Sequence, residues 1–259
     1  MVEVDLSDVA PNCREKLVKE LNNLFKDLEN LKIIAKKDFD KKVTEYLQKR
    51  GVTLPYTSTR SGGEVVAAKT LHYPLIDQQL GTCLILNTNA AIFATCGGGW
   101  EEIERIHCLL HEMGHVIQAQ EKYRQIGHTK FFADPLSTEE CIGELSDDII
   151  SEYMAERHST ETMKSCYKID LIEYFLTRLK GLVGIIVNHL HTFEEDLIQK
   201  TTDFRKGIIS IDDFWEYVYL RTRDILNALS LATASNHAYP EFSAEFNDIR
   251  SDGTYKKFF

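Results

Sequence analysis

The stretch of sequence that decides the fold is residues 100–117, WEEIERIHCLLHEMGHVI. Its apolar side chains recur at the spacing of an α-helix, which predicts a helix that begins near Trp100. Those side chains are Ile103, Ile106, Leu109, Leu110, Val116 and Ile117. The apolar face is wider than the stripe of a surface helix, so we expect this helix to be buried.

Within this helix stands the pentapeptide HEMGH, residues 111–115. His111 and His115 are four residues apart, so both imidazoles leave the same face about one turn apart and can reach a single zinc ion. Glu112 flanks that position. Zinc lowers the pKa of a bound water from about 16 to roughly 7, and an adjacent carboxylate can accept its proton. We therefore interpret the motif as a zinc site with Glu112 as general base.

The residues before this helix predict two helices and a small sheet. Leucines at alternating spacings of four and three predict a helix over 13–31, packed on the rest of the domain. A second helix is expected over 39–49. Segments rich in β-branched and apolar residues predict strands over 64–73 and 81–88, with a third strand over 91–95. The leucines of the first helix are Leu17, Leu21, Leu24, Leu28 and Leu31.

The residues after the HEMGH helix predict mostly helix. A loop is expected from Gly127 to Pro135. Ser137 and Glu140 match a capping box, which predicts a helix running from there to about residue 158. Further amphipathic helices are expected over 171–191 and 211–234.

These elements predict an α+β fold, mostly helical, with a small antiparallel or mixed sheet preceding the HExxH helix. We divide the chain into an N-terminal helical segment (1–56), a catalytic core (57–165) and a C-terminal helical segment (166–259), which together form one compact unit.

Composition narrows the range of partners and compartments. The 259 residues include 40 acidic and 30 basic side chains, a formal net charge of −10. This balance argues against nucleic acid or an anionic membrane as the main partner. The N-terminus lacks a basic region followed by an apolar run, and the six cysteines form no CxxC pair. We therefore expect a cytoplasmic protein with reduced thiols.

A catalytic zinc takes three protein ligands and keeps one position open for water. The residues after His115 lack the Gly and His of the metzincin pattern, which excludes that branch. The capped helix downstream is rich in acids, most of which we interpret as solvated charges. They are Glu140, Glu144, Asp147, Asp148, Glu152 and Glu156.

Residues 151–157, SEYMAER, distinguish this helix. HEMGH followed by a helix with a Glu, and with an acid four residues later, resembles the gluzincin peptidases, in particular the ImmA/IrrE-type intracellular metallopeptidases. The resemblance covers residues 84–158. It implies a zincin-like fold, in which an edge strand of the sheet binds extended substrate. It also implies Glu152 as the third zinc ligand, and a hydrogen bond from a ligating histidine to Glu156 that fixes the tautomer of that histidine. Glu144 and Asp148 remain alternatives to Glu152.

A tyrosine or histidine often stabilises the oxyanion in zinc hydrolysis. The nearest candidates in the sequence are Tyr153, His158 and Tyr167, and nothing in the sequence selects among them.

The expected activity is hydrolysis of peptide bonds in a peptide or protein substrate, with Zn²⁺ as cofactor. The oligomeric state stays open. One alternative is a non-catalytic regulatory or binding protein that keeps zinc for structure and presents the leucines of residues 17–31 to a partner. The other is a zinc hydrolase of a non-peptide substrate.

Overall fold

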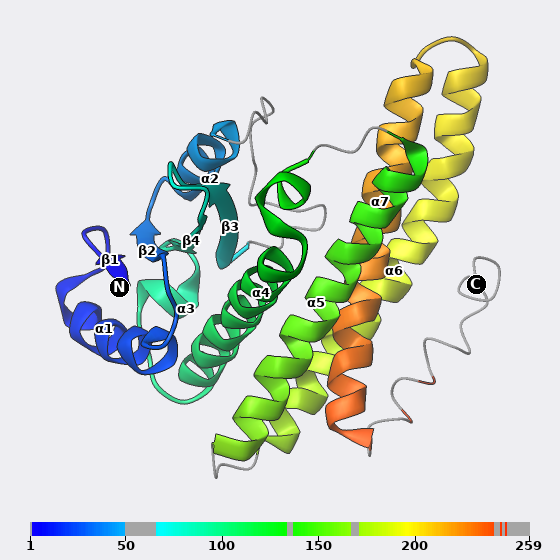
Figure 1. The fold of residues 1–259 in the computed structure, drawn as a ribbon. Helices are drawn as coiled ribbons and strands as arrows, with labels where there is room; N and C mark the ends of the chain where they lie inside the picture. The colour runs from blue at the N-terminus through cyan, green and yellow to red at the C-terminus, as the bar shows by residue number, and fades with distance from the viewer. Residues whose placement is uncertain are drawn as a thin grey trace. The chain divides into compact units, whose positions relative to one another are not determined.

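The computed structural model describes residues 2–49, 66–133, 137–166 and 171–240, together with Ala244 and Asn247. The chain divides into two compact units, residues 1–134 and 135–259. The first contains all four described strands and the helices α1 to α4, and the second contains α5, α6 and α7 (Figure 1). The division into 1–56, 57–165 and 166–259 stays a prediction.

A mixed sheet forms the centre of the first unit. Its strands are β1 (Glu3–Asp5), β2 (Leu31–Lys36), β3 (Ala68–Pro74) and β4 (Leu80–Asn87), in the spatial order β1-β2-β4-β3. The first three in that order run parallel, and β3 pairs antiparallel to β4 at the edge of the sheet. A largely helical chain with a small mixed sheet before residue 100 confirms the α+β prediction.

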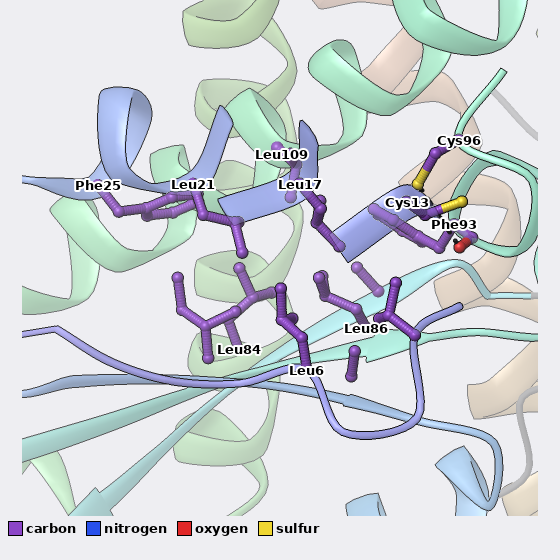
Figure 2. Packing of buried hydrophobic residues seen from close by; sticks show 14 of the residues in the cluster. Leu6, Cys13, Leu17, Leu21, Phe25, Leu84, Leu86, Phe93, Cys96 and Leu109 are labelled. Atoms are coloured by element: carbon purple, nitrogen blue, oxygen red, sulfur yellow. Dashed lines mark hydrogen bonds between the residues drawn. The ribbon is translucent and has the colours of Figure 1, made fainter. Parts of the chain in front are cut away.

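Helices cover both faces of this sheet. Successive side chains of a strand point to opposite faces, and those of β4 are buried on both. One face carries Leu84 and Leu86, which pack with side chains of α1 (Pro11–Phe25) and α4 (Trp100–Phe131). Figure 2 shows Leu17 and Leu21 of α1 above these strand residues. The other face carries Ile85, which packs with α2 (Phe39–Gln48).

The N-terminal region contains strands that the sequence analysis did not predict. The helix expected over 13–31 ends at Phe25, and Leu31 begins β2. Asn30 takes a left-handed conformation, with φ 52°, just before the strand. The leucine spacing continues past the end of the helix, but β2 pairs along its length with β4, whose paired residues lie 51 positions later in the sequence. Leu17 and Leu21 of α1 are buried in the unit's own core and are not a partner surface, whereas Leu24 is partly buried against that core.

The prediction of a strand over residues 91–95 is wrong. Residues Ala91–Ala94 form the short helix α3, whose Phe93 is buried in the core beneath α1. The preceding strand β4 already has β2 on one side and β3 on the other. No ladder position beside β4 is left for a further strand, because a strand has only two hydrogen-bonding edges.

The loop expected from Gly127 is also only partly correct. Gly127 has φ 73° and ψ 172°, a conformation outside the helical region, and the chain then resumes a last turn that ends at Phe131. The glycine therefore breaks the helix without ending it.

The second unit consists of α5 (Thr138–Cys166), α6 (Ile172–Arg205) and α7 (Ile211–Ala238), with α7 packed against both other helices. All three run past the ends predicted from the sequence. The predicted capping box is confirmed: the Glu140 amide donates to Ser137 Oγ at 3.2 Å, and the Ser137 amide donates to Glu140 Oε2 at 3.0 Å. None of the described helices combines the length and apolarity needed to cross a bilayer.

Candidate metal centre

The core-facing side of α4 determines where the HEMGH side chains point. Leu109 and Val116 are completely buried against the sheet and α1. Each helical residue turns by about 100°, so His111 and His115 leave α4 on a different side, and Glu112 lies between the two sides. Glu112 is therefore buried against the sheet, while both histidine rings are half-buried.

A second anchor holds the first half of α4. The guanidinium of Arg105, which has no exposed surface, donates to both carboxylate oxygens of Glu20 on α1 at 2.9 Å. The same group donates to the backbone carbonyls of Ile92 and Gly97 at 3.3 Å. These four bonds join α1, the α3 region and the turn before α4, so the helix that carries HEMGH has little freedom to shift along its axis.

The two histidines present their Nε2 atoms to each other. The Nε2 atoms of His111 and His115 are 3.1 Å apart, with ring centroids at 4.8 Å and an interplanar angle of 78°. Two nitrogens bound to one tetrahedral zinc at about 2.0–2.1 Å stand roughly 3.3–3.4 Å apart. The geometry of the pair therefore fits a shared metal ion with little movement of either ring.

Glu112 has a neutral partner. The hydroxyl of Thr70 on β3 donates to Glu112 Oε2 at 2.5 Å. Within the part of the chain that the structure describes, no Lys or Arg forms an ion pair with Glu112. A buried carboxylate whose partner is a hydroxyl has an oxygen left to bind a metal-bound water and accept its proton.

The acids proposed as third ligand lie on α5, in the second unit. Glu144 and Asp148 are exposed, whereas Glu152 is half-buried. The assignment of Glu152 joins residues of two different units and stays a prediction.

Glu156 is bound within the second unit. It has no exposed surface, and its carboxylate accepts two hydrogen bonds of 3.0 Å from Arg178 on α6. The hydroxyl of Ser235 on α7 donates to Glu156 Oε1 at 3.1 Å. Glu156 therefore links α5, α6 and α7, and its expected bond to a ligating histidine stays a prediction.

The three oxyanion candidates have different surroundings. Tyr153 Oη lies 2.7 Å from Nδ1 of His237 on α7. Burial lowers the pKa of His158, so its imidazole stays neutral, and its Nε2 lies in a buried position without a hydrogen-bond partner in the described chain. Tyr167 lies outside the described residues. A neutral imidazole can donate one hydrogen bond to an oxyanion, but the choice among the three stays open.

Thr70 and Arg105 are the residues of this site that the sequence analysis missed. The strand containing Thr70 was predicted, and its polar Thr70 and His72 alternate with the apolar Leu71 and Tyr73. That alternation indicates a polar face, but it does not tell which helix the face contacts. The sequence around Arg105 does not indicate that this arginine is buried, because its burial depends on an ion pair with Glu20, which lies far away in the sequence.

Comparison with protein-family models, with curated proteins and with solved structures finds no match to this chain.

Proposed function

We propose that this protein is a zinc-dependent hydrolase of peptide bonds. The observation that carries the proposal is the pair of imidazole nitrogens 3.1 Å apart, next to a buried carboxylate without a cationic partner. A zincin-like fold and a cytoplasmic location belong to the same proposal.

His111, His115 and Glu152 would hold the metal, a donor set of two nitrogens and one oxygen that suits zinc and leaves one position open. Bound zinc would supply a water of lowered pKa and would polarise the scissile carbonyl. Glu112 accepts the proton of the attacking water and delivers it to the leaving amine.

The edge position of β3 supports a peptide substrate. An extended peptide can add to an exposed strand through main-chain hydrogen bonds, and β3 is the edge strand whose Thr70 contacts Glu112. A peptide bound along β3 would therefore lie beside the proposed general base. A small non-peptide substrate would not need this edge.

The first test measures zinc. The purified chain is expected to hold a single zinc ion, which His111→Ala and His115→Ala should abolish while Glu112→Gln retains it. Among Glu152→Gln, Glu144→Gln and Asp148→Asn, the ligand is the residue whose change weakens zinc binding most in a chelator competition. A wild-type chain that takes up no zinc in excess metal would contradict the proposal.

The second test measures turnover against a peptide library and a panel of small amides and esters. Glu112→Gln should lower kcat/KM by about 10²–10⁴-fold, because the general base is lost. Glu121→Gln, an exposed acid on the same helix, is the matched control and should leave turnover unchanged. A zinc-loaded chain that cleaves nothing, and that Glu112→Gln does not alter, would instead be a non-catalytic zinc protein. Cleavage of the small substrates alone would indicate a non-peptide hydrolase.

A further inference from the structure

We propose that Thr70 positions the general base: its hydroxyl holds Oε2 of Glu112 so that Oε1 is presented to the attacking water. This inference rests on the proposed function. It adds a residue from the edge strand to a site whose other expected members come from helices.

The direction of the hydrogen bond follows from its partners. An ionised carboxylate can only accept, and a threonine hydroxyl has one proton to donate, so Thr70 is the donor. The 2.5 Å between Thr70 Oγ1 and Glu112 Oε2 is typical of an O–H donor on a charged carboxylate. With Oε2 occupied, rotation of the carboxylate about its last bond is restricted.

Both partners of this bond lie on well-anchored elements. Thr70 pairs in register with Leu84 of β4, which has no exposed surface, and the neighbouring Leu71 is buried on the opposite face. A β-branched threonine on a strand also has few accessible χ1 rotamers. Glu112 lies on the helix that Leu109 and Val116 anchor in the core. The hydroxyl therefore holds the carboxylate at a fixed place relative to the sheet.

The simpler explanation is that the hydroxyl only satisfies a buried polar group. The same hairpin offers a pair of that kind: the hydroxyl of Thr82 on β4, with no exposed surface, lies 3.1 Å from Nδ1 of His72. The Thr82 hydroxyl bonds His72 across the β3–β4 hairpin, whereas the Thr70 hydroxyl bonds Glu112 on α4, so of these two threonines only Thr70 contacts the general base. Thr82 therefore provides the matched control.

The kinetic experiment compares Thr70→Val, Thr70→Ser and Thr82→Val in the zinc-loaded, full-length chain. Valine keeps the shape of threonine and removes the hydroxyl. Thr70→Val should lower kcat about 10–100-fold with KM changed less than about 3-fold, because a misplaced catalytic group costs turnover rather than binding. Thr70→Ser should recover most of the loss, and zinc content should stay unchanged. Thr82→Val should leave kcat within about 3-fold of wild type.

The second readout needs no substrate. In a double-mutant cycle of melting temperatures, Thr70→Val should lower the melting temperature of the wild type but have a smaller effect in a Glu112→Met background, because the acceptor is then already absent. Additive effects would contradict the contact itself.

The outcomes separate the two proposals. Suppose that the wild type is active and Glu112→Gln is inactive. If Thr70→Val then keeps the kcat of the wild type, or if Thr70→Ser does not recover the kcat lost in Thr70→Val, the positioning role is wrong while the proposed hydrolase activity is supported. If the double-mutant cycle shows coupling between Thr70 and Glu112 but neither the wild type nor any variant turns over a substrate, both the hydrolase activity and the positioning role are wrong.

Discussion

Glu112 on α4 and Glu156 on α5 are both buried glutamates in long helices, with 8% and 0% of their surface exposed. Their partners differ. Glu112 accepts a hydrogen bond from the neutral hydroxyl of Thr70, whereas Glu156 is held by the guanidinium of Arg178 and by Ser235.

The two kinds of partner, a guanidinium and a hydroxyl, have different effects on a carboxylate. A carboxylate bound by arginine is stabilised in its charged form and makes a poor proton acceptor, because the cation lowers its basicity. A hydroxyl partner fixes the position of a carboxylate without adding a positive charge beside it. Burial alone therefore does not distinguish the two glutamates, but the charge of their partners does.

The largest expected effect is on Glu156. Glu156→Gln should lower the free energy of unfolding by about 3 kcal/mol, because it removes the negative charge from a buried ion pair with Arg178. Arg178 is 32% exposed and can regain some water, so we expect the low end of the range for such pairs. Glu112→Gln should change the free energy by less than about 1 kcal/mol, since the amide oxygen still accepts from Thr70. Urea unfolding of both variants measures the contrast.

The paired replacement Glu156→Met with Arg178→Met is the control. It removes both charges together and should recover much of the lost stability. Equal losses for Glu156→Gln and Glu112→Gln would remove the distinction between the two glutamates.

The second effect concerns the break in α4. Gly127→Ala should lower the free energy of unfolding by about 2 kcal/mol, because φ 73° with ψ 172° is accessible almost only to glycine. A built Cβ there meets nothing within 4 Å, so the cost is in the backbone and not in a clash. The matched control is Gly143→Ala inside α5, where helix propensity predicts a gain of up to about 1 kcal/mol. Thermal unfolding measures both, and a stabilising Gly127→Ala would mean that α4 runs straight.

The third effect concerns the start of α5. Ser137→Ala removes the side-chain acceptor of the Glu140 amide and should lower the free energy of unfolding by about 1 kcal/mol. Ser146→Ala, inside the same helix, removes only a hydroxyl that bonds the carbonyl of Ile142 and should be neutral or slightly stabilising. Chemical denaturation of the two variants compares them directly, and equal effects would show that the capping box does not hold the helix end.

The smallest effect is a pH dependence in the second unit. Burial lowers the pKa of His158 from its ordinary value of 6.5, and Glu161 only partly opposes this shift. As the pH falls below that ordinary value, the unfolded chain takes up a proton that the folded chain resists, so the stability present at neutral pH declines. Melting temperatures across this range should fall with pH in the wild type and less steeply in His158→Gln. An unchanged slope in the variant would assign the pH dependence to other groups.

Local features of the sequence were enough to predict several elements. The HEMGH helix, the capping box at Ser137 and the helical second half depend on spacings within a few turns, which the chain carries by itself. The strand β2 was missed although LKIIAK is apolar, because the leucine spacing before it continues the helical pattern and its pairing partner lies far along the chain. The segment 91–95 was misassigned because nothing local shows that β4 has both edges paired.

The sequence by itself determined that two imidazoles and one carboxylate stand within five residues of a single buried helix, since helical geometry is set within one turn. Only the tertiary structure decided what each buried glutamate contacts. Thr70 and Glu112 are 42 residues apart, and Glu156 and Arg178 are 22 residues apart on different helices. Such contacts depend on how strands and helices pack, because each pairing is one of many that the residue types would allow.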